Sequence, residues 1–160
     1  MTNDNSQALN IFSSICSLCD EIGLTYERSE DELLITMSIT GEDLPMKMGI
    51  FVRPDRELVK LISPMPFTVT EDRRVDLAVA VAYANYGLAD GCFDYDIADG
   101  TISFRITAPY AGSILGKEVF RYMIYIASKA VDYYNDKFLM LSKSMITLEQ
   151  FIHSTKDEDK

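Results

Sequence analysis

"FDYDIADGTISF", residues 93–104, fits two different structures, a calcium-binding loop and a β-hairpin. An EF-hand calcium loop takes oxygen ligands from its positions 1, 3 and 5, a glycine at position 6 and a glutamate at position 12. Counted from Asp94, position 5 is Ala98 and position 12 is Arg105, whose positive charge would repel calcium. The spacing of these residues therefore argues against a calcium site.

A hairpin with a two-residue turn at Asp99 and Gly100 accounts for the same stretch, because this dipeptide favours the tight turns that join antiparallel strands. The turn sets Asp94 opposite Arg105, as a cross-strand pair of opposite charge. It also sets Ala98 opposite Thr101. On the other face it sets Ile97 opposite Ile102, Tyr95 opposite Phe104 and Phe93 opposite Ile106. Because every large apolar side chain then lies on one face, we predict a hairpin here.

The composition predicts one domain that folds without disulfides or metal. The chain has 160 residues, of which 48% are hydrophobic, which suffices for one core. We expect a single α+β domain over residues 1–153 and a disordered acidic tail over residues 154–160. The formal net charge is -10, and such a field repels phosphate backbones and anionic lipid surfaces. We therefore expect no nucleic acid partner and no membrane partner.

The start of the sequence and its cysteine content predict a cytoplasmic protein. Residues 1–12 lack the basic start and the long apolar run of a signal peptide. No stretch approaches the ~20 apolar residues that a membrane-spanning helix needs. The three cysteines, an odd number, are typical of reduced thiols in a cytoplasm.

The spacing of apolar residues predicts helices at both ends of the chain and an antiparallel sheet between them. Apolar residues recur at three- and four-residue steps in the predicted helices and at every second residue in the predicted strands. The helices span residues 7–22, 70–87, 115–141 and a short turn over 147–152. The strands span residues 33–40, 46–52, 57–63 and a short segment over 24–28. The predicted fold class is α+β: an N-terminal helix, an antiparallel meander of three to four strands, a helix, a β-hairpin and a long C-terminal helix.

Two prolines follow the last strand of the meander. Pro64 and Pro66 cannot donate backbone hydrogen bonds to a sheet, so we expect the chain to leave the sheet at this point. The spacing of Thr68 and Glu71 fits a capping box, which predicts that the middle helix begins near residue 70.

The predicted middle helix carries two apolar rows on roughly opposite sides. The first row is Val75, Ala78, Val79, Ala82, Tyr83 and Tyr86, and the second row is Leu77, Val81, Ala84 and Leu88. One row can cover the sheet, so the other needs a second partner. Either the long helix covers it within the chain, or it forms a symmetric contact with a second copy. We take the second row as the candidate dimer or partner interface.

Residues 110–118 resemble a phosphate-binding loop, but two of the required positions are wrong. The first glycine of the motif is replaced by Ala111, and the hydroxyl residue that would bind magnesium is replaced by Glu118. A carboxylate at that position opposes phosphate, so we predict no nucleotide site.

The other motifs of catalytic and metal sites are also incomplete. Cys16 and Cys19 fall inside a predicted helix, and one such pair cannot hold zinc alone. The single histidine, His153, lies near the end of the chain, so a serine or cysteine nucleophile has no well-placed base. We therefore predict that the protein is not an enzyme and has no catalytic, cofactor-binding or metal-binding residues.

A fixed order of turns and strands runs from Val75 to Arg105. A helix ends in a turn that contains Asn85. After this turn come Gly91-x-Phe93, a strand, Asp99-Gly100 and a second strand. The next helix contains the paired tyrosines Tyr133 and Tyr134. This stretch resembles the bacterial YbjN-like family, described as candidate regulators of sensory transduction. The order of elements over residues 8–140 is similar to the type III secretion chaperone-like fold.

The resemblance implies a small acidic protein that binds other proteins, often as a homodimer and without a cofactor. Chaperones of the similar fold bind an extended stretch of their partner through apolar surface patches. We therefore expect a chaperone-like, adaptor or regulator protein that recognises a protein segment by apolar contact or by adding a strand to its sheet edge. Methionines suit an adaptable surface of this kind as well as a core. A second interpretation is a regulator that senses a small ligand in a pocket between the sheet and the long helix, ringed by tyrosines. The candidate binding-surface residues are Met46, Met48, Tyr122 and Tyr125.

Overall fold

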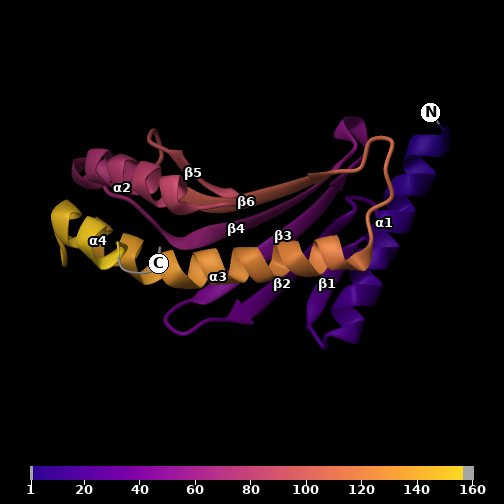
Figure 1. Cartoon of the computed structure of the whole chain (residues 1–160), viewed down its shortest axis with the longest axis horizontal. Coiled ribbons are helices and arrows are strands. Elements are labelled where there is room, and N and C mark those ends of the chain that lie inside the picture. The colour runs from indigo at the N-terminus through magenta and orange to yellow at the C-terminus, as the bar shows by residue number, and fades with distance from the viewer. Residues whose placement is uncertain (1, 157–160) are drawn as a thin grey trace.

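The computed structural model describes residues 2–156, which form six strands and four α-helices (Figure 1). The first half contains α1 (Thr2–Glu21), β1 (Tyr26–Ser29), β2 (Leu34–Thr40), β3 (Pro45–Arg53) and β4 (Leu58–Thr68). The second half contains α2 (Arg74–Gly87), β5 (Cys92–Asp96), β6 (Thr101–Pro109), α3 (Lys117–Ser142) and α4 (Leu148–Ser154). The α+β class and the order of elements expected from the sequence are confirmed.

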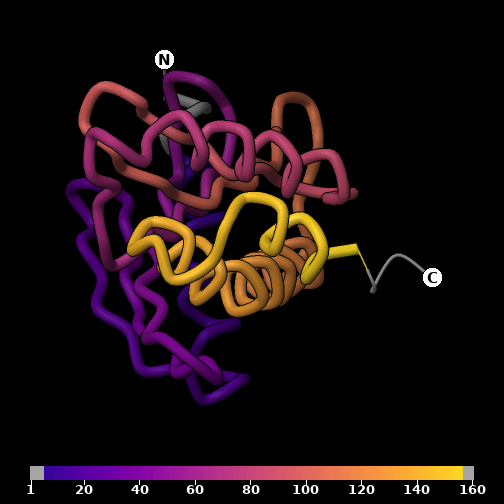
Figure 2. The backbone as a smooth tube through the Cα atoms, turned by 90° about the vertical axis from the view of Figure 1, so that its left-hand side faces the viewer, coloured from indigo at the N-terminus to yellow at the C-terminus, as the bar shows by residue number. Residues whose placement is uncertain are grey.

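All six strands form one antiparallel sheet in the order β1-β2-β3-β4-β6-β5. Helix α3 runs along the sheet, with α1 at one end and with α2 and α4 at the other (Figure 1). The end view in Figure 2 shows α4 lying between α2 and the end of α3, and α4 contacts both helices. In β2 and β3, buried residues alternate with exposed or half-buried ones. The sheet therefore has an inner face, packed against helices, and an outer face.

Aromatic side chains fill the core at the end where α4 lies. The Phe93 ring makes edge-on contacts with Phe104 and Phe138, at centroid distances of 5.3 and 5.2 Å. Phe151 of α4 stacks on Phe138 at 5.4 Å, and both are fully buried. Aromatic pairs in these geometries contribute about 0.5–1.5 kcal/mol beyond the burial of their surface. Helix α4 thus completes the core.

Strand β4 is longer than predicted, because it continues through both prolines to Thr68. Pro64 pairs with Ser103, and the register then shifts before Thr68 pairs with Thr101. Both prolines are exposed while Met65 between them is buried, so the alternation of the strand is kept. A sheet tolerates proline, which has no N–H donor, at a register shift of this kind. The expectation that the chain leaves the sheet at the prolines is therefore wrong.

Helix α2 begins at Arg74, after a 3-10 turn over Glu71–Arg73. Thr68 is still paired in the sheet, so it does not form the predicted capping box with Glu71. A capping box does occur at α4, where Thr147 accepts a hydrogen bond from Gln150 N–H and the Gln150 side chain accepts one from Thr147 N–H. The prediction of a cap before α2 is wrong because β4 extends to this point.

The β5–β6 hairpin is confirmed, but its register differs by two residues from the prediction. Tyr95 pairs with Ile102, and Phe93 pairs with Phe104. The connection has four residues, because the Asp96 carboxylate accepts a bond from Ala98 N–H and the Asp96 carbonyl accepts one from Gly100 N–H, each at 2.8 Å. Since the shift is even, the apolar side chains keep the predicted face.

The described chain ends at Lys156, two residues beyond α4. Thr155 is buried, and its hydroxyl donates a hydrogen bond of 3.1 Å to the Phe151 carbonyl. Residues 157–160, the remainder of the predicted acidic tail, lie outside the described residues. Within residues 2–156, no helix combines the length and the apolar character that crossing a membrane requires.

Candidate functional site

A groove of about 590 Å³ crosses the outer face of the sheet from β1 to β4. Small side chains, Thr36, Ser38 and Gly49, form its floor, and Phe51 and Ile62 form a half-buried apolar wall. Thr36 lies opposite Gly49, which in turn lies opposite Ile62. The floor thus runs across three strands, from hydroxyl groups near the edge of the sheet to an apolar wall near its centre.

Gly49 sets the depth of this groove. A Cβ atom at this position would lie 3.1 Å from the Phe51 ring and 3.7 Å from a methyl group of Leu34. The Phe51 ring therefore leans over the glycine and occupies space that any other residue would need. A larger residue at position 49 would push the ring aside and reshape the wall.

The hydrogen-bonding pattern of the sheet shows which backbone groups of β1 are free. Val52 N–H donates to the Leu33 carbonyl at 3.0 Å. Because bonding direction alternates along an antiparallel strand, the odd-numbered residues of β2 bond to β3 and the even-numbered ones bond to β1. The β1 residues opposite these even-numbered residues are Glu27 and Ser29.

Tyr26 and Arg28 consequently direct their N–H and C=O groups away from the sheet. Among residues 2–156, no backbone or side-chain group bonds to these four groups. The Tyr26 hydroxyl meanwhile donates to the Asp20 carboxylate at 3.0 Å, which fixes β1 against the end of α1. This edge of the sheet is held in place and is open to hydrogen bonding.

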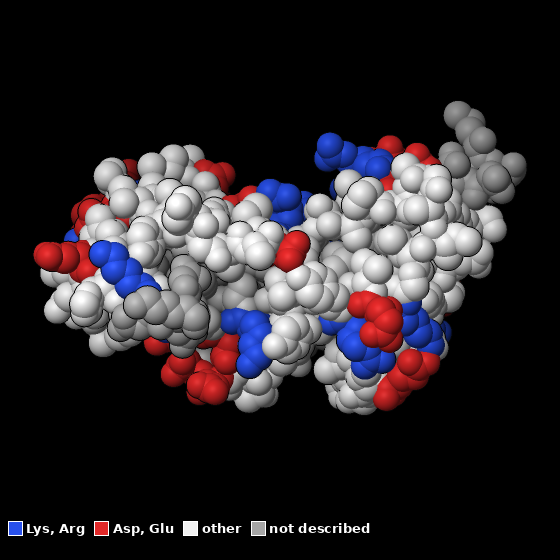
Figure 3. All heavy atoms as spheres, in the orientation of Figure 1, with Lys and Arg blue, Asp and Glu red and all other residues white. Residues whose placement is uncertain are grey.

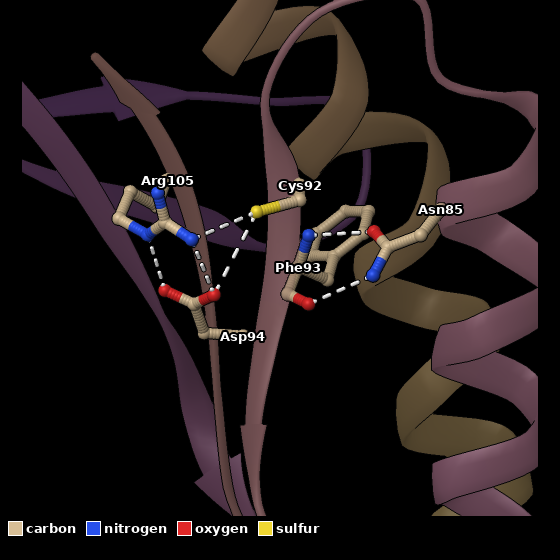
Figure 4. A network of polar contacts seen from close by, with 5 residues as sticks. All are labelled: Asn85, Cys92, Phe93, Asp94 and Arg105. Carbon is tan, nitrogen blue, oxygen red and sulfur yellow. Dashed lines mark hydrogen bonds and ion pairs between the residues drawn. The ribbon is translucent and has the colours of Figure 1, made fainter.

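The opposite edge, at β5, is closed at Phe93 by Asn85 (Figure 4). The outward backbone groups of Tyr95 have no such partner within residues 2–156. The Asn85 side-chain amide donates to the Phe93 carbonyl at 2.9 Å, and its oxygen accepts from Phe93 N–H at 2.7 Å. The amide makes the same pair of bonds that a residue in a neighbouring strand would make. A further strand therefore cannot pair with Phe93 while Asn85 is in place.

Three polar side chains lie together on the outer face beside β5 (Figure 4). Arg105 donates two hydrogen bonds to the Asp94 carboxylate, at 2.6 and 2.9 Å, and lies 3.2 Å from Cys92 Sγ. The bonds from Arg105 lower the pKa of Asp94, and burial raises the pKa of the Cys92 thiol. A thiol with a raised pKa stays protonated near neutral pH, so this cluster lacks an activated nucleophile.

The candidate interface row of the middle helix packs inside the chain. Leu77 and Ala84 are 0% exposed and Val81 is 5% exposed, while Leu88 is half-buried. Helix α2 packs with β5, α3 and α4. The row thus already has intramolecular partners, and contact with another copy through it would require α2 to move away from the core.

The first row of the middle helix faces outward instead. Val75, Val79 and Tyr86 are 69%, 45% and 92% exposed. The surface over α2 in Figure 3 is largely free of charged side chains, whereas acidic and basic side chains are interspersed elsewhere on this face. Helix α2 therefore presents an exposed apolar row that nothing covers within residues 2–156.

The four candidate binding-surface residues lie in two separate places. Met46 and Met48 are 3% and 2% exposed and belong to the inner face of β3. Tyr122 and Tyr125 are 46% and 56% exposed on α3. The Tyr122 hydroxyl donates to the Asp90 carboxylate at 2.5 Å, which raises the pKa of the tyrosine. The methionines and the tyrosines do not form one surface.

A second hollow, of about 680 Å³, lies along α3 beside the end of α2 and the connection between β2 and β3. Tyr122, Tyr133 and Lys137 contribute to its lining. Lys137 Nζ donates to the Tyr133 carbonyl at 2.6 Å and lies 4.0 Å from the centre of the Tyr133 ring. Within residues 2–156, the residues that line this hollow come from helices and connections and none comes from a strand, so it is not the predicted ligand pocket between the sheet and the long helix.

The sequence predicted contact at a sheet edge without saying which edge is open, and it did not predict the outer groove. One signal was present: Leu34, Phe51 and Ile62 are apolar residues at strand positions between the core positions. A sheet face that only meets water is usually polar at such positions. Apolar residues on both faces of β2, β3 and β4 are therefore the sequence signal of an outer face that is not uniformly polar.

No known protein family matches the chain, and no curated protein matches it. Similar folds do occur among solved structures. YbjN from E. coli, a candidate transcription regulator, has a TM-score of 0.55 at 9% identity, over 78% of this chain and 91% of that chain. A chain of the ExsC–ExsE complex has a TM-score of 0.53 at 14% identity, over 79% of this chain and 92% of that chain. These matches confirm the fold that the sequence resemblance implies.

Proposed function

We propose that the chain is a non-enzymatic protein-binding module, of the chaperone or adaptor kind, that takes up an extended segment of another protein along β1. The observation that carries this proposal is the set of outward-facing backbone groups of Tyr26 and Arg28, next to a groove. A strand added to a sheet edge gains affinity from main-chain hydrogen bonds and specificity from pockets for its side chains. The similarity to a chain of the ExsC–ExsE complex supports a protein partner. In this proposal the protein acts in the cytoplasm, and it works by binding its partner without catalysing a reaction.

Arg28→Pro tests the proposal, because proline removes the outward N–H of Arg28 without removing a bond to β2. Arg28→Ala is the matched control, since it removes the same side chain and keeps the N–H. Tagged wild-type and variant proteins would be used to capture partners from the native cytoplasm, with identification by mass spectrometry. We expect one abundant partner to be retained by wild type and Arg28→Ala and lost from Arg28→Pro. Equal retention by both variants would contradict strand addition at β1.

We further propose that two copies associate through the outward row of α2, because Val75, Val79 and Tyr86 form an exposed apolar surface. Val79→Glu places a charge in that contact, and the solution mass by light scattering should fall from dimer to monomer. Ala111→Glu, on an exposed loop, is the control and should leave the mass unchanged. A wild-type mass equal to one chain, 18.1 kDa, would contradict the dimer.

A second candidate function is the sensing of a small ligand, favoured by the hollow of about 680 Å³ along α3. Tyrosine and lysine side chains there combine apolar surface with polar tips, as ligand sites do. Mass spectrometry of the protein purified under native conditions tests this candidate. A retained small molecule that Tyr122→Ala no longer retains would favour sensing over protein binding.

A further inference from the structure

Two lysines flank the apolar wall of the outer groove. Lys47 lines the groove on β3, and Lys60 lies opposite Phe51 on β4. Both residues alternate with buried positions of their strands, so they belong to the outer face. Within residues 2–156, neither lysine has a carboxylate within ion-pair distance. The wall formed by Phe51 and Ile62 is thus bracketed by two lysines that form no ion pair within residues 2–156. Lys60 does act on Asp94 from a longer distance and helps to lower its pKa.

This local charge is opposite to that of the chain as a whole. Acidic residues outnumber Lys and Arg by 25 to 15, which gives the formal net charge of -10. The two arginines of the outer face are already neutralised, Arg53 by Asp55 and Arg105 by Asp94. One acidic residue, Glu27, lines the groove, at its far end on β1. Around the apolar wall itself, the unpaired charge is positive.

A strand added to β1 cannot fill this part of the groove. Neighbouring strands lie about 4.8 Å apart, so an added strand would be roughly 14 Å from β3 and roughly 19 Å from β4. These distances exceed the reach of one side chain. A partner that contacts the wall must therefore cross the outer face with a separate segment.

We propose that the outer groove binds a protein segment in which apolar residues alternate with acidic ones. Its apolar side chains pack on Phe51 and Ile62 above the floor at Gly49, and its carboxylates pair with Lys47 and Lys60. Charge complementarity of this kind sets specificity and the rate of association more than affinity. The proposal rests on the proposed function, because it names the chemistry of the partner that the module takes up.

Three labelled synthetic peptides of equal length test the proposal by fluorescence anisotropy. The first alternates leucine or phenylalanine with aspartate, the second has lysine in place of each aspartate, and the third has serine in place of each apolar residue. We expect the first peptide to bind about tenfold more tightly than either of the others, and to bind less tightly as salt is raised. Tighter binding of the lysine peptide, or no binding of the first peptide, would overturn the proposal.

Two pairs of variants locate the binding site. The double variant with Lys47→Glu and Lys60→Glu should reduce affinity for the first peptide at least about tenfold. The control is the double variant with Lys129→Glu on α3 and Lys143→Glu just after it. Both control positions are exposed, so this variant should have little effect on peptide affinity. Thr36→Trp should block the floor, and Thr70→Trp, at an exposed position between β4 and α2, is its control. Equal effects within either pair would overturn the assignment to the groove.

Two further measurements separate the possible failures. Arg28→Pro should leave peptide binding unchanged. A loss of the captured partner in this variant therefore reports on strand addition at β1, whereas a loss of peptide binding in the double lysine variant reports on the groove. If Arg28→Pro loses the captured partner and the first peptide does not bind to the wild-type protein, the proposed function stands and this inference is rejected. Dodecanoate, which has a single apolar chain and one carboxylate, is the small-molecule probe. If dodecanoate binds and the first peptide does not, the inference of a protein segment is also rejected.

Discussion

The two edges of the sheet are built in opposite ways. At β5, Asn85 occupies both outward backbone groups of Phe93, and an aromatic cluster supports the strand from the inner face. At β1, the outward groups of Tyr26 and Arg28 have no partner within residues 2–156. Proteins usually protect sheet edges because an open edge pairs with other chains. Asn85 therefore blocks strand addition at Phe93 of β5, whereas no group within residues 2–156 blocks it at Tyr26 and Arg28 of β1.

The largest expected effect breaks the closed edge from its inner side. Phe93→Ala removes the ring that contacts Phe104 and Phe138 and leaves a cavity, so the free energy of unfolding should fall by about 3–5 kcal/mol. Urea denaturation measures this change. Ser29→Ala, at the open edge, should change it by less than about 0.5 kcal/mol. Similar losses for both variants would contradict the difference between the edges.

The next effect opens the closed edge directly. Asn85→Ala leaves the N–H and C=O of Phe93 without their partners, and the free energy of unfolding should fall by about 2–4 kcal/mol. Hydrogen exchange should show faster exchange of the Phe93 amide. Asn10→Ala, at an exposed position of α1, is the control with the same substitution and should show neither change. A protected Phe93 amide in Asn85→Ala would mean that another group closes this edge.

A smaller effect sharpens the assignment of the open edge. Arg28→Pro removes an N–H that bonds to nothing within the described chain, whereas Glu27→Pro removes one that bonds to β2. The second variant should lose about 0.5–1.5 kcal/mol more stability than the first, which is the net contribution of one hydrogen bond. Thermal denaturation compares the two proteins. The reverse order would show that the bonding directions along β1 are the opposite of those given above.

The smallest effect concerns the ion pair beside the closed edge. Because Arg105 lowers the pKa of Asp94 in the folded state, the stabilisation is present above the unfolded pKa of aspartate, about 3.9, and is lost as pH falls through the folded value. Both side chains are partly exposed, so solvent screening limits the effect to less than about 1 kcal/mol. The free energy of unfolding is measured by denaturation at pH 7 and below pH about 3. It should differ less between these two pH values for Asp94→Asn than for wild type. An unchanged difference would mean that the pair contributes nothing.

The sequence predicted features that depend on local alternation. Leu33, Ile35 and Met37 alternate with less buried residues as expected, and the even register shift of the hairpin left Phe93 and Tyr95 on the predicted face. Local patterns are sufficient here because the period of two fixes the face of every side chain in a strand.

Features that depend on distant partners were not predictable in this way. Strand β4 extends past Pro64 because β6 supplies a partner from about 40 residues later in the chain. The two apolar rows of α2 are equivalent in periodicity, and the packing of α3 and α4 decides which one is buried. Asn85 could be recognised as a turn residue, but its bonds to Phe93 depend on where α2 lies against β5.

The position of Phe151 has a consequence for how the protein is made. The aromatic cluster takes its last member from α4, whereas Phe93, Phe104 and Phe138 all precede it in the chain. During synthesis the N-terminal part of a chain emerges first, and unfilled apolar surface makes such intermediates prone to aggregation. A nascent chain with all six strands and α3 in place would still expose the stacking face of Phe138 until α4 is made. The core is therefore completed only after all six strands and α3 have been made and α4 follows them.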